Sequence, residues 1–132
     1  YAAATVPRIC LVLRKAYGGA YIVMDSRELG NDACFAWPGA EIAVMGSKGA
    51  VQILFGKRLA AIDDPAERER QRIALETDYD ARFCSPVEAA ERGLVDEVID
   101  PHDTRRVLGA ALAVHARKRE TGVARKHSIS PC

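Results

Sequence analysis

The stretch RKAYGGAYIVMDS, residues 14–26, places two adjacent glycines between two apolar runs. The run before them, VPRICLVLR (6–14), is apolar on both alternating faces and rich in β-branched residues. That pattern is typical of a strand in a parallel sheet that is covered on both sides. The run after them, AYIVMDS (20–26), is too short and too apolar for a surface helix. It predicts a buried helix that begins at Gly19 or Ala20.

A strand that leads into two glycines and then a helix leaves the helix N-terminus open to a negatively charged group. The N–H groups of the first turn have no partner within the helix, and the positive end of the helix dipole lies behind them. Glycine allows a reacting carbonyl group to approach the main chain closely. The stretch therefore predicts an oxyanion-binding site built from backbone N–H groups, with a plain tight turn as the alternative.

The rest of the chain alternates short apolar strands with capped helices. Strands are expected at CFAWP (34–38) and AEIAVMG (40–46), followed by a helix at KGAVQILF (48–55) that Gly56 ends. A last strand is expected at LVDEVI (94–99). Three later helices open with a capping residue and proline, at Asp64-Pro65, Ser85-Pro86 and Asp100-Pro101, and end near Phe83, Gly93 and Gly122. This order predicts an α/β fold.

The composition indicates one soluble globular domain. The chain has 132 residues, of which 48% are hydrophobic, and a net charge of +1. Such a charge provides no broad field for nucleic acid or an anionic membrane, and the apolar runs fall far short of the ~20 residues that span a bilayer. The first residues lack an initiator methionine and a signal-like apolar core, so we expect a cytoplasmic chain that starts within a longer protein.

The cysteines are widely scattered and form no C-x-x-C pair; they are Cys10, Cys34, Cys84 and Cys132. This spacing indicates neither a zinc site nor a disulfide framework. We expect reduced thiols that are mostly buried, and no metal in this chain.

Several sequence blocks, taken in their order and spacing, carry a family resemblance. The blocks are LRKAYGGAYIVMDS, FAWPGAEIAVMG, GAVQILF, AAERGLVDEVIDP and DTRR, and the likeness extends to RKHSIS near the C-terminus. Together they resemble the carboxyltransferase β subunit of biotin-dependent acyl-CoA carboxylases, a family that includes acetyl-CoA and propionyl-CoA carboxylases. Such subunits are several times longer and contain two related halves with a crotonase-like (ClpP/crotonase) fold. The resemblance implies that residues 1–132 form most of the C-terminal half, as a single truncated domain.

The resemblance also implies a reaction and a site. In this family, carboxybiotin on a carrier protein gives its carboxyl group to the α-carbon of an acyl-CoA, and each half of the subunit provides one oxyanion hole. The hole of the C-terminal half holds the ureido oxygen of biotin. Matched residue by residue, this hole consists of the backbone N–H groups of Gly19 and Ala20, with Gly18 allowing the close approach before them.

Three side chains flank the implied hole: Tyr17, Tyr21 and Ile22. The resemblance implies that they shape the acyl and biotin pockets; the alternative is that they are core residues of a buried helix. The family tends to have aspartate at the position of Ile22 in propionyl-preferring members and isoleucine in acetyl-accepting ones. We therefore expect acetyl-CoA as the substrate, with propionyl-CoA as a second one.

The implied chemistry requires no side-chain acid, base or nucleophile, because the ureido anion of biotin takes the α-proton itself. The protein provides positioned donors and excludes water. The implied partners are a biotin carboxylase and biotin carrier subunit, the N-terminal carboxyltransferase half, and further copies in an oligomer, a hexamer in the intact family member. Biotin and acyl-CoA are the implied ligands.

Three other functions stay open. A crotonase-type hydratase or isomerase shares the fold but uses glutamate for proton transfer, and no glutamate lies close behind the glycine pair. A decarboxylase shares the same blocks, because the chemistry is reversible through the same intermediates. The chain could also be a non-catalytic structural piece that completes a composite site.

Overall fold

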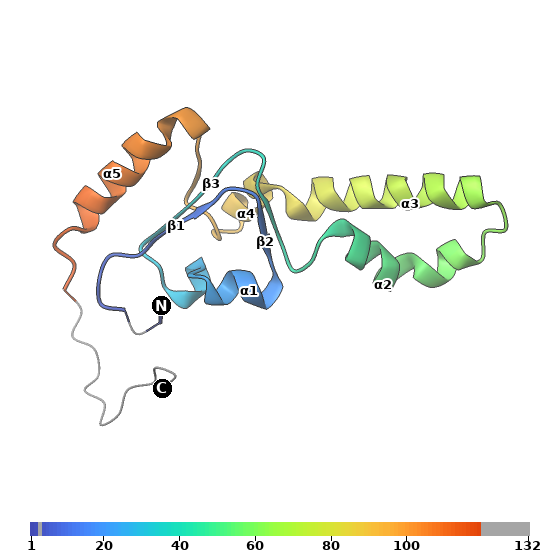
Figure 1. Cartoon of the computed structure of the whole chain (residues 1–132), viewed down its shortest axis with the longest axis horizontal. Coiled ribbons are helices and arrows are strands. Elements are labelled where there is room, and N and C mark those ends of the chain that lie inside the picture. Colours follow the sequence, from blue (N-terminus) through green and yellow to red (C-terminus); the bar gives the residue numbers. More distant parts are fainter. Residues whose placement is uncertain (3, 120–132) are drawn as a thin grey trace, which may run out of the picture.

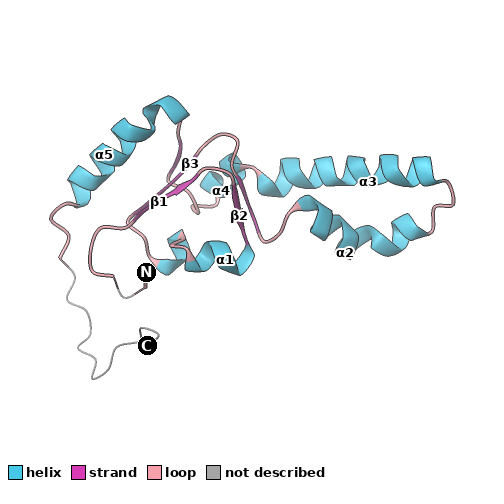
Figure 2. Ribbon diagram, viewed as in Figure 1, coloured by secondary structure: helices cyan, strands magenta, loops and turns pink. Residues whose placement is uncertain are grey.

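The computed structural model describes residues 1–2 and 4–119, and two small parallel sheets form its centre (Figure 1; Figure 2). In the first sheet, β3 (Ala33–Ala36) lies between β1 (Ile9–Val12) and β5 (Glu97–Val98). In the second, β2 (Lys15–Tyr17) pairs with β4 (Glu41–Ala43). All residues of β3 are buried, as in a parallel strand covered on both faces. The predicted α/β class with parallel strands is confirmed.

The predicted strand over residues 6–14 is divided between the two sheets. β1 ends at Val12 and β2 begins at Lys15, so the chain passes from the first sheet to the second within two residues. β3 and β4 follow the same path, because β1 pairs with β3 and β2 with β4. The helix α1 (Gly18–Val23) begins where β2 ends and forms part of the connection to β3. It therefore starts at the carboxyl end of the second sheet.

The helix α1 begins at Gly18, one residue before the predicted start. The predicted burial of this helix is wrong for the described chain, because none of its residues is buried. Ile22 and Val23 are 43% and 63% exposed, and Met24, just after the helix, is 66% exposed. Tyr21 alone among the side chains of α1 is recorded in contact with the hydrophobic core. Within residues 1–2 and 4–119, the apolar side chains of Ile22 and Val23 thus keep much of their surface exposed.

Two antiparallel helices, α2 (Ser47–Ala60) and α3 (Pro65–Tyr79), pack side by side and project away from the sheets (Figure 1). The prediction that Gly56 ends the first of them is wrong, since α2 continues for four residues beyond it. A glycine inside a helix costs only about 1 kcal/mol relative to alanine. Continuing the helix brings Leu59 into a buried position, where it is 6% exposed. Burial of this side chain outweighs the cost of the glycine.

The remaining helices follow the predicted caps. The side chains of Asp64, Ser85 and Asp100 each accept a hydrogen bond from the backbone N–H group two residues further on. The helical elements after α3 are the π-helical turn η2 (Asp80–Cys84), α4 (Pro86–Glu91), the short helix η3 (Pro101–Asp103) and α5 (Thr104–His115). Gly93 has a φ of 74° just after α4, as a helix stop requires. The predicted end of the last helix, at Gly122, lies outside the described residues.

One face of α5 covers the first sheet. The residues that make this contact are Val107, Leu108 and Ala111, which pack against the buried cluster of Ala33, Phe35 and Ile99. The helix α5 thus covers one face of the first sheet, and the core cluster that Tyr21 contacts covers the other face. Over the described part of the chain, no helix combines the length and apolar character needed to cross a membrane.

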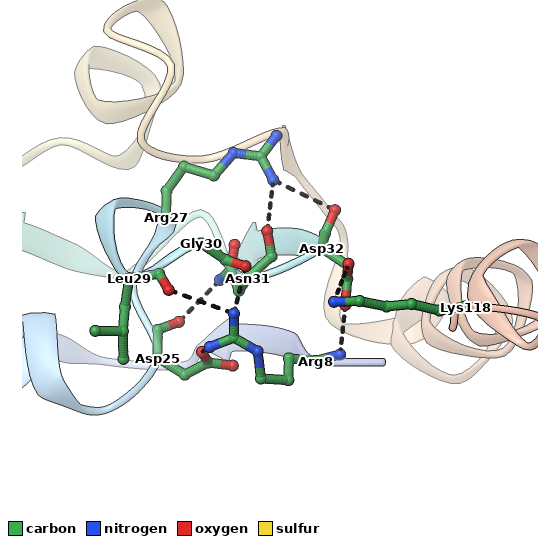
Figure 3. A network of polar contacts seen from close by, with 8 residues as sticks. All are labelled: Arg8, Asp25, Arg27, Leu29, Gly30, Asn31, Asp32 and Lys118. Atoms are coloured by element: carbon green, nitrogen blue, oxygen red, sulfur yellow. Dashed lines mark hydrogen bonds and ion pairs between the residues drawn. The ribbon is translucent and has the colours of Figure 1, made fainter. Parts of the chain in front are cut away.

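A buried ion pair holds the segment after α1 against the start of β1 (Figure 3). The guanidinium group of Arg8 contacts the carboxylate of Asp25 at 2.6 Å, and both side chains are less than a tenth exposed. Arg8 also donates to the carbonyl oxygens of Leu29, at the end of the short helix η1 (Arg27–Leu29), and of Gly30. The side chain of Asn31 donates to the carbonyl oxygen of Asp25. Asp25 has a φ of 74°, and these bonds stabilise that turn at the exit of α1.

Candidate functional site

The two glycines differ in what their backbone positions require. Gly18 has a φ of 58°, and a Cβ atom there would lie 3.0 Å from the carbonyl oxygen of Val44. Both its conformation and this close contact therefore favour glycine. Gly19 has ordinary helical geometry, and a Cβ atom there would meet nothing within 4 Å. The space beside Gly19 is thus left open by the described chain.

A cavity of about 340 Å³ lies at the carboxyl ends of β2 and β4, and both glycines line it. Gly18, Gly19, Ile42 and Ala43 are part of its lining, together with residues of η2 and α4. The volume lies within the range of small-molecule sites, roughly 300 to 1,000 Å³. In open α/β sheets, ligands bind in crevices outside the carboxyl ends of the strands. This cavity is therefore the candidate functional site.

The first turn of α1 lies at the edge of this cavity, where Gly18 and Gly19 are part of the lining. The N-cap residue is Tyr17, and its side chain makes no capping hydrogen bond. The N–H groups at the start of a helix have no acceptor within the helix, and the helix dipole makes them attractive to negative charge. Gly19 lines the cavity, whereas Ala20, whose N–H group is the next in the chain, is exposed and does not line it.

The structure brings Tyr21 and Ile22 to the same cavity as the glycine pair. Ile22 contributes a half-exposed apolar side chain. The hydroxyl group of Tyr21 instead points into the protein, where it is buried and has no hydrogen-bond partner among the described residues. Burial and the neighbouring Cys34 thiol raise the pKa of Tyr21 well above its ordinary value. Tyr21 therefore lines the cavity with its ring and stays neutral.

Tyr17 does not line the cavity. Its hydroxyl group donates to the carboxylate of Glu41, and its ring lies against Gly46, where a Cβ atom would come within 3.2 Å of the ring. Burial and this hydrogen bond raise the pKa of Tyr17. In the described chain, Tyr17 ties the end of β2 to β4 and to the start of α2.

Sequence reasoning missed the residues that form the opposite wall of the cavity. Tyr79 and Phe83 line it from the end of α3 and from η2, with ring centroids 5.0 Å apart. Glu88 of α4 and Arg92, which follows the end of that helix, also line it and form an ion pair at 2.7 Å. The spacing of the aromatic pair, four residues apart at the end of a charged helix, was the available signal. The π-helical turn that carries Phe83 is a feature often found at functional sites.

The lining of the cavity can be compared with the chemistry of the group that the sequence resemblance implies. Within residues 1–2 and 4–119, no three His, Cys, Asp or Glu side chains gather closely enough to hold a metal. The lining combines the start of α1, whose first N–H groups lack acceptors within the helix, with the apolar residues Ile22, Ile42 and Phe83. Unpaired donors beside apolar side chains suit a ring system that carries a carbonyl-type oxygen. A biotin ureido group has this chemistry, so the residues present fit it.

Comparison with known proteins gives matches along nearly the whole chain. The profile of the carboxyl transferase domain family matches residues 1–129. The chain is 52% identical over 132 residues to the methylmalonyl-CoA carboxyltransferase 12S subunit of Propionibacterium freudenreichii subsp. shermanii. It is 47% identical over 131 residues to the methylmalonyl-CoA decarboxylase subunit alpha of Propionigenium modestum. It covers 25% of the length of each of these curated relatives.

A solved structure supports the same likeness in three dimensions. The transcarboxylase 12S crystal structure, a hexamer with methylmalonyl-coenzyme A bound, matches with a TM-score of 0.88 and 52% identity. The match covers 100% of this chain and 25% of that one. It confirms the crotonase-like fold that the sequence resemblance implied.

The contrast between the two glycines predicts opposite effects of the same substitution. Gly18→Ala is expected to lower the free energy of unfolding of the intact protein by about 1 to 2 kcal/mol, because alanine disfavours a positive φ. Gly19→Ala is expected to raise it by roughly 0.5 to 1 kcal/mol, because alanine is the better helix former and meets open space. Denaturant unfolding of both variants measures this. Equal effects of the two changes would contradict the assigned geometry.

Proposed function

Because the chain belongs to the carboxyl transferase domain family, we propose that it is the biotin-binding part of the carboxyltransferase component of a biotin-dependent acyl-CoA carboxylase. In the proposed reaction, a carboxyl group passes from biotin on a carrier protein to the α-carbon of a short-chain acyl-CoA. The observation that carries the proposal is the gathering of Gly18, Gly19, Tyr21 and Ile22 at one cavity, next to uncapped N–H groups.

The proposed role of α1 is to bind the ureido oxygen of biotin through the backbone N–H groups of Gly19 and Ala20. When bound, carboxybiotin supplies both the carboxyl group and, through its ureido group, a base for the α-proton of the acyl-CoA. The donors are held by the backbone before the reaction begins, so they need no reorganisation as negative charge develops. Gly18 sets their direction, because its positive φ turns the chain from β2 into the helix.

The walls of the cavity have a second proposed role, which is to keep water from the transferred carboxyl group. Ile42 is 4% exposed and packs in the core, while Ile22 and Phe83 are partly exposed and also line the cavity. Excluding water prevents hydrolysis of a reactive group and strengthens the hydrogen bonds to developing charge. The ion pair of Arg92 and Glu88 forms a polar part of the lining.

The proposed substrate is acetyl-CoA, with propionyl-CoA as a second substrate. The support is Ile22, which lies at the cavity in the position that favours acetyl-CoA in the family pattern. The relatives compared above are named for methylmalonyl-CoA, the carboxylation product of propionyl-CoA. One methylene group changes binding by only about 1 to 3 kcal/mol, so a single residue can shift this preference.

The proposed partners follow from the fraction of the relatives' length that this chain covers. It spans a quarter of their length, so the acyl-CoA hole and most of the CoA surface are assigned to an N-terminal half. A biotin carboxylase and a biotin carrier deliver the carboxyl group. The 12S structure is a hexamer by its own description, and we propose a homo-oligomer of the same kind for the intact protein.

A second candidate function is acyl-CoA decarboxylation. The likeness to a methylmalonyl-CoA decarboxylase subunit favours it, at 47% identity. Both directions use the same donors and the same cavity, because the transfer is reversible. Assays of the intact protein with free and carboxylated carrier distinguish the two directions.

The proposed hole is tested by removing one of its donors. Ala20→Pro in the intact protein removes an N–H group in the first turn of a helix, where proline is tolerated. The rate of carboxyl transfer is expected to fall ~100-fold or more, which corresponds to roughly 3 kcal/mol. Ala20→Ser keeps the N–H group and serves as the control, with a rate close to that of the parent. A folded Ala20→Pro protein with an unchanged rate would exclude this donor.

The proposed substrate preference is tested at Ile22. Ile22→Asp is expected to shift the ratio of kcat/KM values from acetyl-CoA towards propionyl-CoA by about tenfold, within the range of one pocket contact. Val23→Asp places the same charge one residue further on, at a side chain that does not line the cavity. That control should leave the ratio unchanged. If both variants keep the parental ratio, residue 22 does not determine acyl preference.

A further inference from the structure

Two cysteines that the proposed function does not use lie side by side on neighbouring strands. Cys10 of β1 and Cys34 of β3 are register partners in a parallel pair. Both belong to the same packed cluster, so their side chains lie on one face of the sheet. Neighbouring strands are about 4.8 Å apart, and disulfides form at Cα separations of about 4.4 to 6.8 Å. The backbone thus already has a separation that a disulfide accepts.

The two thiols have different environments. Cys34 is fully buried, whereas Cys10 is partly exposed. Hydrogen bonding with Cys34 lowers the pKa of Cys10 below its ordinary value, against the opposing effects of burial and the charge of Asp25. The same bond and burial raise the pKa of Cys34. The thiolate, which is the reactive form, therefore develops on the more accessible sulfur atom, beside a thiol that keeps its proton.

Cys84 provides a matched comparison within the same chain. It is buried in η2, and burial together with a hydrogen bond to Asp80 raises its pKa to about 12. No cysteine is its register partner among the described residues. Cys84 therefore has neither the activation nor the partner that Cys10 has. The fourth cysteine, Cys132, lies outside the described residues.

We propose that Cys10 and Cys34 are a dithiol site that a hydroperoxide oxidises to an intrachain disulfide, and that this disulfide disturbs α1 through Tyr21. The Cys10 thiolate attacks the O–O bond and becomes a sulfenic acid, while the departing oxygen takes a proton and leaves as an alcohol or water. The Cys34 sulfur then displaces the hydroxyl group, which leaves as water with the Cys34 proton. The two thiols lose two electrons, and the hydroperoxide gains them.

Tyr21 connects this pair to the candidate site. Its ring lines the cavity from α1, while its buried hydroxyl group lies beside the Cys34 thiol, within the packed cluster that contains both residues. When the two sulfur atoms bond, Cys34 loses its proton and its sulfur moves towards Cys10. The packing around the hydroxyl group of Tyr21 then changes. Close packing transmits such a change, so Tyr21 and the helix that carries it must adjust.

The disulfide is tested by peptide mapping of the intact protein. The reduced protein is treated with hydrogen peroxide, its remaining thiols are alkylated, and trypsin is added without reductant. A peptide that links residues 9–14 to residues 28–48 is expected, and dithiothreitol should separate the two parts. Cys84→Ser should give the same cross-link. Cys34→Ser should stop at a sulfenic acid that dimedone traps on Cys10. Absence of the cross-link, with Cys10 unreacted or oxidised further, would overturn the proposal.

The effect on α1 is tested by the rate of carboxyl transfer, and this half of the proposal rests on the proposed function. Oxidation should lower the rate roughly tenfold or more, since a shift of about 1 Å in a site can cost ~100-fold. Reduction should restore it, and Cys34→Ser should resist the loss. A cross-linked protein with a full rate would overturn the link to α1. An inactive reduced protein would instead count against the proposed function, because the peptide map needs no activity.

Discussion

The arrangement of the site depends on the close approach of Gly18 to the carbonyl oxygen of Val44. A side chain at residue 18 would place its Cβ atom only 3.0 Å from that oxygen, so glycine lets the turn out of β2 lie directly against the end of β4. Because the two strands are parallel, their carboxyl ends meet there. This contact therefore places the start of α1, with its uncapped N–H groups, next to the cavity.

Much of this could be predicted from the sequence because the signals are local. The glycine pair, the apolar run before it and the three proline caps each depend on a few adjacent residues. A helix forms at the glycine pair and at each proline cap, and the apolar run forms strands, although it is divided between two sheets. The direction of Tyr17 could not be predicted, since it depends on Glu41, which is 24 residues away in the sequence. The wall formed by Tyr79 and Phe83 likewise requires η2 to fold back beside β4. The continuation of α2 through Gly56 depends on tertiary burial of Leu59.

The predicted burial of α1 was wrong for a reason that bears on function. The helix is apolar, yet Val23 is largely exposed, and so is Met24 just beyond it. The chain spans a quarter of the length of the relatives that it matches. The buried ion pair of Arg8 and Asp25 holds the exit of the helix in place, although Val23 and Met24 beside it stay exposed. An apolar surface beside a candidate site suits a composite active site, in which the proposed N-terminal half or another copy completes the cavity.

The central claim is that backbone N–H groups at the start of α1 bind the ureido oxygen of biotin. A crystal structure of the intact protein with biotin methyl ester bound tests it most directly, because the ester replaces the carrier protein without changing the ureido ring. The account predicts a ureido oxygen about 2.7 to 3.1 Å from the backbone nitrogen atoms of Gly19 and Ala20. Biotin bound with its ureido oxygen held by other groups, or in a different cavity, would contradict it.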